Sequence, residues 1–472
     1  MTKTIEVRNP RTGKFDYVIL PPPPRLLVNQ CNRARRAQIR WQKIGLEGRI
    51  AALQQWKQAI ISRREQLTEA LVNDTGRLST SVLEIDSFLA SIDRWCGLAP
   101  EILQDTAKNT TIPFIALQQT SVPYPLVGVI SPWNFPLLLS TIDTIPALLA
   151  GCAVVVKPSE IAPRFVAPLI TALHAAPELH DVLCFVEGAG ETGATLIECV
   201  DLICFTGSVA TGRQVAAVAA QRFIPAFLEL GGKDPAIVLE SANIELATSA
   251  ILWGSVVNAG QSCLSIERIY VAESIFDEFY HQLIAKAHSL ELAYPKIDSG
   301  EIGPIISERQ AAIINDHLLD AVEKGALIHC GGKVEELGGG WWCRPTVITQ
   351  VNHSMKVMTE ETFAPIMPVM PFPTVEEAVY LANDSVYGLS AAVFAESEAE
   401  ALVVAQYIDA GAISINDAGL TAMMHEGEKN AFKFSGLGGS RMGPASIKRF
   451  LRKKAFLIKT DFNSDPWWFD KK

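Results

Sequence analysis

The stretch Leu202-Ile-Cys-Phe-Thr-Gly-Ser-Val-Ala-Thr-Gly212 places a continuous apolar run directly before a Gly-Ser turn and the start of a helical pattern. A strand that is apolar at every position is typical of a parallel sheet covered by helices on both faces. Other apolar runs, separated by helical stretches, surround it at residues 127–130, 153–156, 183–186 and 236–239. The alternation predicts an α/β fold with a parallel sheet.

The pattern continues on both sides of this region. Residues 32–103 have apolar positions at helical spacing, and residues 1–25 are expected to form an extended arm with a turn at 9–13. A second alternating region follows, with strands expected at 268–271, 326–329, 369–370 and 391–394. The basic stretch 447–459 is interpreted as an interface strand, and the aromatic residues Trp467 and Trp468 then need no membrane.

Composition narrows the class of protein. The chain has 472 residues, 41 basic and 51 acidic, so its formal net charge is −10, and 49% of it is hydrophobic. This length predicts two or three domains, and the acidic balance argues against a general nucleic-acid binder. Nine cysteines with no Cys-x-x-Cys pair favour a reducing, cytoplasmic setting and no metal site. The uncharged stretch 120–142 contains four prolines, so no membrane span is expected.

Four short stretches contain residues suited to chemistry, and each has a plainer alternative. The turn at Gly207 and Ser208 could hold phosphate at a helix start, or be an ordinary strand-to-helix turn. Glu229, between two leucines and before two glycines, is suited to proton abstraction near neutral pH, or could form a salt bridge.

The other two stretches contain a thiol and an amide. Cys263 follows a Gly-Gln turn and is expected on a loop or helix start, where a helix dipole would lower its pKa; otherwise it is a small buried hydrophobe. Asn134, between Pro132 and Pro136, could donate its amide to a developing oxyanion, or serve as a turn residue.

Taken together, these stretches resemble the aldehyde dehydrogenase superfamily over nearly the whole chain. The matching motifs are Pro132-Trp-Asn-Phe-Pro136, Lys157-Pro-Ser-Glu160, Phe205-Thr-Gly-Ser208, Leu228-Glu-Leu-Gly-Gly-Lys233, Gly260-Gln-Ser-Cys263, Glu360-Glu-Thr-Phe-Ala-Pro365, Tyr387-Gly-Leu389 and Lys433-Phe-Ser-Gly436. The resemblance implies a Rossmann-like cofactor domain, an α/β catalytic domain and a small β oligomerisation extension. It implies domain bounds of 1–105 with 124–231, then 232–430, with 106–123 and 431–472 as the bridging segments and tail.

The resemblance also implies roles. Cys263 would attack the aldehyde carbonyl, Asn134 would bind the oxyanion, and Glu229 would activate water to hydrolyse a thioester. The expected cofactor is NAD, with NADP possible. Its expected contacts are Ser131, Trp133, Lys157, Ser159, Glu160, Gly207, Ser208, Gly231, Glu361 and Phe363.

The expected substrate tunnel has no charged residue. It would be lined by Phe135, Leu138, Leu139, Ile142, Trp253, Val257, Ser262 and Leu264, which favours apolar aliphatic or aromatic aldehydes. The alternatives are an acylating, coenzyme A-dependent aldehyde dehydrogenase and a non-catalytic dinucleotide-binding protein. A homodimer or homotetramer is expected, with a small-molecule aldehyde and no nucleic acid as partner.

Three departures from the family pattern stand out. Ala364 occupies a usual glycine position, which is tolerable unless that position needs a positive φ. The lead into the Lys433 motif is not glycine-rich, and the loop 418–429 is unlike that of better-known members. The last two differences bear on the substrate side.

Overall fold

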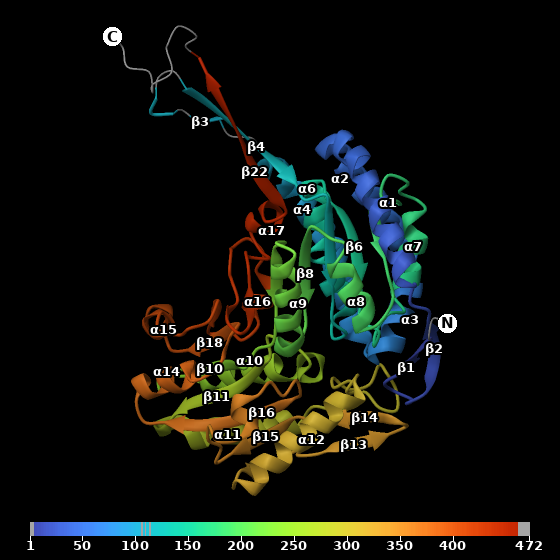
Figure 1. The fold of residues 1–472 in the computed structure, drawn as a ribbon. Coiled ribbons are helices and arrows are strands. Elements are labelled where there is room, and N and C mark those ends of the chain that lie inside the picture. Colours follow the sequence, from blue (N-terminus) through green and yellow to red (C-terminus); the bar gives the residue numbers. More distant parts are fainter. Residues whose placement is uncertain (1–3, 105–106, 109, 113–114, 461–472) are drawn as a thin grey trace.

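The computed structural model describes residues 4–104, 107–108, 110–112 and 115–460. Within them the chain forms two largely parallel sheets, each with its own hydrophobic core, and a narrow antiparallel sheet that projects from the body (Figure 1). The α/β fold expected from the alternating apolar runs is confirmed.

The first sheet has the strand order β21-β9-β8-β5-β6-β7. Its members are β5 (Leu126–Ile130), β6 (Ala153–Lys157), β7 (Leu183–Phe185), β8 (Leu202–Thr206), β9 (Ala226–Glu229) and the antiparallel edge strand β21 (Gly436–Leu437). The chain builds outward from β5 to β7 and then returns to the other side of β5 with β8. This reversal is the switch point at which doubly wound sheets bind ligands.

Helices cover both faces of this sheet. The predicted N-terminal helical region is confirmed as α1 (Pro24–Lys43), α2 (Gly45–Ile61), α3 (Arg64–Thr75) and α4 (Leu78–Ile102). α1 starts with Pro24, whose fixed φ suits a first helical position, and it packs on β6. The indole of Trp41, almost fully buried, donates to the Leu148 carbonyl 2.9 Å away. The remaining helices are α5 (Pro136–Thr141), α6 (Thr144–Ala150), α7 (Val166–Leu173), α8 (Gly190–Ile197) and α9 (Val209–Gln221).

The second sheet has the order β12-β15-β16-β11-β10-β18-β19 and is parallel apart from the β12–β15 pair. Its strands are β10 (Asp234–Val238), β11 (Ile266–Ala272), β12 (Leu327–Ile328), β15 (Thr346–Thr349), β16 (Ile366–Phe372), β18 (Ser390–Phe394) and β19 (Ala412–Ile415). Its helices are α10 (Ile244–Val256), α11 (Phe276–His288), α12 (Glu308–Glu323), α14 (Val375–Asn383) and α15 (Glu398–Ala405).

Short elements complete the described chain. They are β1 (Ile5–Arg8), β2 (Phe15–Ile19), β13 (Val334–Leu337), β14 (Gly340–Cys343), β17 (Tyr387–Gly388), β20 (Phe432–Lys433), η1 (Val257–Gly260), η2 (Glu273–Ile275), α13 (Lys356–Thr359), α16 (Leu420–Met423) and α17 (Ala445–Lys448). β1 and β2 pair as a hairpin, so the expected turn at 9–13 is confirmed, and the Asn9 amide donates to the Lys14 carbonyl.

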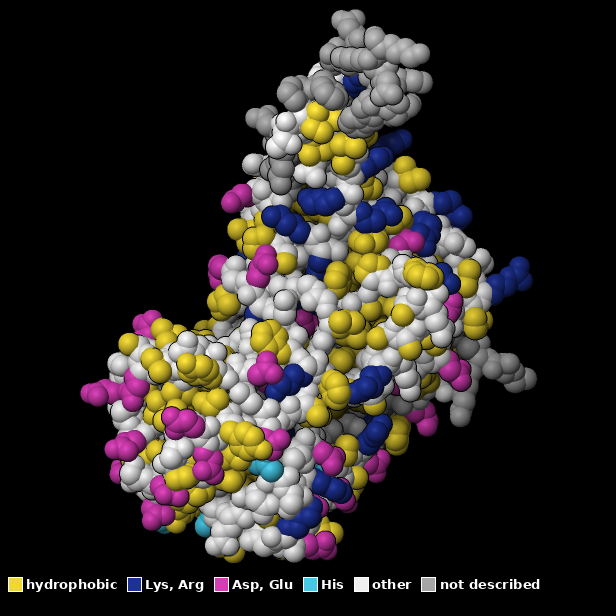
Figure 2. Space-filling view, turned by 60° about the vertical axis from the view of Figure 1, so that its left-hand side comes forward, with side chains coloured by type: hydrophobic (Ala, Val, Ile, Leu, Met, Phe, Trp, Pro, Cys, Tyr) yellow, Lys and Arg dark blue, Asp and Glu magenta, His cyan; other side chains and the backbone are white. Residues whose placement is uncertain are grey.

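The projecting sheet has the order β22-β4-β3. β22 (Leu451–Lys459) pairs along its whole length with β4 (Ile115–Pro123), and β3 (Ala107–Lys108) lies on the other side of β4. The basic stretch 447–459 therefore does contain a strand. Trp467 and Trp468 lie outside the described residues. Figure 2 shows hydrophobic side chains next to Lys and Arg side chains in this upper part of the molecule.

A short connection joins the two large sheets. β9 ends at Glu229, and β10 begins only five positions later at Asp234. The carboxyl end of β9 therefore lies close to the amino end of β10. Among the described helices, none combines the length and the apolar composition needed to cross a membrane.

Candidate functional site

Most of the predicted cofactor contacts lie just beyond the carboxyl ends of parallel strands in the first sheet. Ser131 and Trp133 follow β5, Ser159 and Glu160 follow β6, Gly207 and Ser208 follow β8, and Gly231 follows β9. Ser208 is the N-cap of α9, and its hydroxyl oxygen accepts from the Thr211 amide at 3.3 Å. The sheet thus brings residues spread over a hundred positions to one edge, at the switch point.

Lys157 and Glu160 form an ion pair at this edge. The Lys157 Nζ lies 3.1 Å from Glu160 Oε2 and also donates to the Pro158 carbonyl at 3.1 Å. Burial lowers the pKa of Lys157, and the neighbouring Glu160 only partly offsets this effect. Because Lys157 is almost fully buried and already paired, Glu160 presents the more accessible charge.

Cys263 lies on a turn between η1 and β11, and not at the start of a helix. Asn258, Ala259 and Gly260 have successive positive φ values of 62°, 54° and 70°, which end the helical path before the cysteine. Of the two settings expected for Cys263, a loop and a helix start, the structure shows the loop, so no helix begins at this thiol. Burial, together with the carboxylates of Glu361, Asp234 and Glu229, raises the pKa of Cys263 to about 12.

Asn134 is tied to the turn that carries Cys263. Its Nδ2 donates to the Gln261 carbonyl at 3.1 Å, and its own backbone oxygen accepts from Asn258 Nδ2 at 3.1 Å and from Arg77 Nη2 at 3.0 Å. Gln261 in turn donates from Nε2 to the carbonyls of Asn258 and Pro304. The Asn134 amide is therefore hydrogen-bonded to the turn that carries Cys263, although 129 positions separate the two residues.

Two glycines after Glu229 bring its segment against the same turn. A Cβ on Gly232 would lie 2.4 Å from the Cys263 carbonyl oxygen, and one on Gly231 would lie 2.5 Å from Glu361 Oε2. Only a residue without a side chain permits these approaches. Glu229, Cys263 and Glu361 are thus brought to one place from three separate segments.

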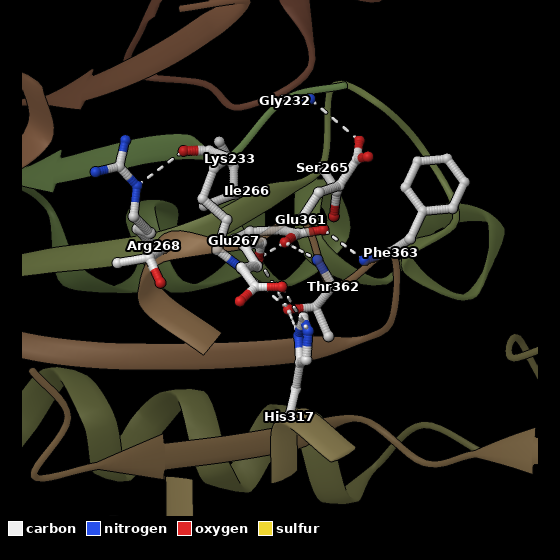
Figure 3. Close-up of polar contacts among 12 residues, drawn as sticks. Gly232, Lys233, Ser265, Ile266, Glu267, Arg268, His317, Glu361, Thr362 and Phe363 are labelled. Atoms are coloured by element: carbon white, nitrogen blue, oxygen red, sulfur yellow. Dashed lines mark hydrogen bonds and ion pairs between the residues drawn. The ribbon is translucent and has the colours of Figure 1, made fainter. Parts of the chain in front are cut away.

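A buried ion pair between Lys233 and Glu267 holds the segment that contains Glu361 (Figure 3). Lys233 Nζ lies 2.6 Å from Glu267 Oε2, and both side chains are at most 2% exposed. The Glu267 carboxylate also accepts from the amides of Thr362 and Phe363, at 2.7 and 2.8 Å. His317 Nδ1 contacts Thr362 Oγ1 at 3.1 Å. The cluster fixes the backbone of the segment that contains Glu361.

Glu361 accepts a hydrogen bond from the Gly232 amide at 3.1 Å. Burial and the nearby Glu267 raise the pKa of Glu361 to about 8. Phe363 has a left-handed φ of 56°, and its ring meets that of Trp133 edge-on, with centroids 5.6 Å apart. Ala364 is not among the residues of positive φ, so its methyl group causes no backbone strain there.

The residues predicted to line a substrate tunnel come from separate elements. Leu138 and Leu139 lie on α5, Trp253 on α10 and Val257 at the start of η1, while Leu264 follows Cys263. All are half-buried except Trp253, which is 49% exposed. A Cβ on Gly419 would lie 2.4 Å from the Trp253 ring, so the unusual loop 418–429 packs on this tryptophan. The Phe135 ring lies 6.0 Å from the Arg77 guanidinium.

Three further residues at the site were missed in the sequence. Gln261 belongs to the motif Gly260-Gln-Ser-Cys263. Its hydrogen bonds to Asn134, Asn258 and Pro304 depend on the left-handed turn, which the sequence does not specify. Arg441 and Lys429 both interact electrostatically with Glu229 and Cys263, and each comes from a distant loop. Lys429 is half-buried, its Nζ donates to the Thr421 carbonyl at 2.9 Å, and burial lowers its pKa. No local pattern links these cations to Glu229.

All nine cysteines are free; seven are buried, while Cys199 and Cys263 are half-buried. In the part of the chain that the structure describes, no group of three or more His, Cys, Asp or Glu side chains is arranged to hold a metal ion. Cys263 is therefore the half-buried thiol that lies beside Glu229 and Asn134.

Comparison with known proteins agrees with this geometry. The model of the Aldehyde dehydrogenase family matches residues 1–456. The chain belongs to the aldehyde dehydrogenase family. It is 37% identical over 474 residues to 4,4'-diapolycopene aldehyde oxidase from Methylomonas sp, covering 99% of this chain and 88% of that protein. It is 34% identical over 444 residues to a protein assigned as an NADP-dependent succinate-semialdehyde dehydrogenase from Mycobacterium ulcerans, covering 92% and 84%.

Solved structures of aldehyde dehydrogenases share the whole fold. PutA from Anabaena variabilis, assigned as an aldehyde dehydrogenase, is 83% identical, with a TM-score of 0.98 and coverage of 99% of this chain and 100% of that one. Betaine aldehyde dehydrogenase from Staphylococcus aureus, solved with NAD+, is 31% identical, with a TM-score of 0.92 and coverage of 99% and 94%. The likeness extends over both sheets.

Proposed function

We propose that this aldehyde dehydrogenase oxidises an aldehyde to a carboxylic acid with a nicotinamide dinucleotide and water, through a covalent intermediate on Cys263. The observation that carries the proposal is the meeting of three groups at the junction of the two sheets. Cys263 supplies a nucleophile, Asn134 an amide donor bonded to the same turn, and Glu229 a carboxylate on the segment that touches this turn. These are the groups that acyl transfer through a thioester requires.

Each group has one task in this scheme. The Cys263 thiol loses its proton to solvent and its sulfur bonds to the aldehyde carbon, while the side-chain amide of Asn134 and the backbone amide of Cys263 stabilise the oxyanion of the thiohemiacetal. A nicotinamide dinucleotide held by the first sheet would supply the hydride acceptor for this carbon, and a thioester on Cys263 would remain. Glu229 then takes a proton from water, the water oxygen bonds to the acyl carbon, and the carbon–sulfur bond breaks. Because the acyl group stays attached to Cys263, its carbon remains at the site through both steps.

The first sheet fits a dinucleotide. Its switch point lies between β5 and β8, and the amides at the start of α9 offer donors for a pyrophosphate. Glu160 can accept hydrogen bonds from ribose hydroxyls, while its charge opposes a 2′-phosphate, so NAD is favoured over NADP. The KM for each cofactor tests this preference: an NADP value tenfold lower would overturn it, and Glu160→Gln should lower the KM for NADP selectively.

NADH formation over a panel of aldehydes tests the activity itself. We expect NADH and acid in equal amounts, without coenzyme A, and no turnover in Cys263→Ser. NADH formation that depends on coenzyme A would instead identify the acylating reaction. Full NADH production by Cys263→Ser would refute the covalent route, and the absence of NADH with every aldehyde would favour a non-catalytic protein.

The uncharged residues predicted for the tunnel support an apolar aliphatic or aromatic substrate. The Methylomonas relative is named for 4,4'-diapolycopene aldehyde, which supports this preference. Comparison of kcat/KM for butanal, decanal, benzaldehyde and succinic semialdehyde decides the question. Decanal or benzaldehyde should give the highest value.

A specific observation favours a second substrate class. Lys429 reaches the site from the loop 418–429, and the Mycobacterium relative is assigned to succinate semialdehyde. A cation there could bind the carboxylate of a semialdehyde. If succinic semialdehyde gives the highest kcat/KM and Lys429→Met raises only its KM, this alternative holds and the apolar preference falls.

We also propose that the projecting sheet joins copies of the chain. In the corresponding domain division, the cofactor domain comprises 1–105 and 124–231 and the catalytic domain 232–430. The bridging segments are 106–123 and 431–472. Leu457 is 74% exposed on β22, and Phe456 and Ile458 beside it are 43% and 45% exposed. Leu457→Asp should convert a dimer or tetramer into smaller species in light scattering. An unchanged mass would argue that another surface assembles the protein.

The free cysteines support a location of the protein in a reducing cytoplasm.

A further inference from the structure

Arg441, Asp143 and Arg449 form a buried ionic cluster whose arginine Arg441 interacts electrostatically with Glu229. Arg441 Nε and Nη2 lie 3.2 and 2.9 Å from the two oxygens of Asp143, and Arg449 Nη2 also pairs with Asp143. All three side chains are at most 9% exposed. With two guanidinium groups and one carboxylate, the cluster has one positive charge in excess. A buried excess charge is costly unless another group compensates it.

The backbone places this cluster next to the base. Arg441 Nη2 donates to Thr206 Oγ1 at 2.6 Å, and Thr206 is the register partner of Glu229 in the parallel pair β8–β9. Register partners on neighbouring strands project from the same face. On the other edge of β9, Gly436 pairs with Glu229, so the segment that leads to Arg441 starts at the base itself.

The hydrogen bonds of Arg441 leave part of its guanidinium available. Nε and Nη2 are occupied by Asp143 and Thr206, so among the described residues the N–H groups of Nη1 remain for another acceptor. Although burial would lower it, the pKa of Arg441 is raised, because Asp143 and then Glu229 lie nearby. Lys429 is the second cation that faces Glu229, and the Cys263 thiol faces it as well.

We propose that Arg441, held by Asp143 and Thr206, is a positioning residue that orients the Glu229 carboxylate toward the water that hydrolyses the acyl-Cys263 thioester. Asp143 is essential to this role, because an arginine without it would form a full ion pair with Glu229 and withdraw the base. The inference rests on the proposed function, since it assigns a role within the same site.

The experiment separates formation of the acyl-enzyme from its hydrolysis without any nucleotide. With p-nitrophenyl acetate, the Cys263 thiol loses its proton to solvent and its sulfur bonds to the acetyl carbon as nitrophenolate leaves. Water then adds to that carbon, its proton passes to Glu229, and the sulfur is released. A burst of nitrophenolate measures the first step, and steady turnover measures the second. The same two steps are read with decanal and NAD as an NADH burst and a steady rate.

Arg441→Met should keep a burst of about one nitrophenolate per Cys263 at a rate within about threefold of the wild type. Its steady rate should fall about 10- to 100-fold, the size expected for a misplaced base. Arg441→Lys should recover part of that loss. Arg449→Met is the matched control, because it removes the other partner of Asp143 while Arg441 and its bond to Thr206 stay; its steady rate should remain within about threefold.

Equal losses in burst and steady rate for Arg441→Met, or equal slowing by Arg449→Met, would overturn the proposal and make the cluster purely structural. If Arg441→Met does not fold, the comparison of Arg441→Lys with Arg449→Lys decides in the same way, since both keep a cation beside Asp143. A Cys263→Ser variant that keeps the full burst would instead refute the proposed function.

Discussion

Gly232 and Cys263 approach so closely that a Cβ on the glycine would lie 2.4 Å from the cysteine carbonyl oxygen. Backbone meets backbone at this contact, so no side chain can turn away to make room. The segment after the base and the turn of the nucleophile are therefore in direct contact. In the proposed mechanism, this contact lets formation and hydrolysis of the thioester take place at one acyl carbon.

Gly232→Ala should displace the Cys263 turn and lower kcat/KM for aldehydes by about tenfold or more, as misplacement of reacting groups does. Gly231→Ala is the matched control, because its Cβ would meet the flexible Glu361 carboxylate, 2.5 Å away. That variant should mainly raise the KM for NAD. Steady-state kinetics with both substrates distinguish the two, and identical effects would contradict the close contact as the cause.

The raised pKa of Cys263, about 12, predicts an unusual pH dependence of alkylation in the protein without ligands. Only the thiolate reacts, so the iodoacetamide rate should rise about tenfold per pH unit from pH 7 to pH 10. An ordinary cysteine would level off near pH 9. Mass spectrometry of the labelled peptide follows the rate, and Cys263→Ser shows which signal belongs to this thiol. A plateau below pH 9 would disprove the prediction.

Glu361 should make stability depend on pH. Its pKa is raised from an ordinary value of 4.5 to about 8, so the folded state binds more protons than the unfolded state within this window. The free energy of unfolding should therefore decrease as pH rises from 4.5 to 8. Glu361→Gln lacks this effect and should gain stability relative to the wild type over the same window. Urea unfolding at several pH values measures the difference, and parallel curves would contradict it.

Loss of the buried Lys233–Glu267 pair should be costly. Glu267→Gln leaves Lys233 without its counter-charge, and removal of one partner from such a pair costs about 3–5 kcal/mol. Glu198→Gln is the control, because its pair with Arg222 is exposed and should contribute less than about 1 kcal/mol. Urea denaturation gives both values. A cost below about 1 kcal/mol for Glu267→Gln would mean that water or another group compensates Lys233.

The sequence predicted those parts of the molecule that depend on local patterns. Apolar runs revealed most strands of both sheets, and the motifs around Asn134, Glu229 and Cys263 identified the family. The environment of Cys263 could not be inferred, because three consecutive left-handed residues, including Ala259, replace the expected helix start. β9 was missed because it has only four residues and just one is fully buried. Arg441 and Asp143 lie 298 positions apart, and only the folded chain shows that they are partners.

The short connection between the two large sheets has a mechanical consequence. Glu229 ends the last parallel strand of one sheet, whereas Cys263 precedes a strand of the other, and residues 230–233 join the two sheets. Because Gly232 packs against the backbone of Cys263, the position of one sheet relative to the other sets the spacing of these two side chains. In the proposed mechanism, a change that shifts one sheet against the other would therefore alter the distance between base and nucleophile.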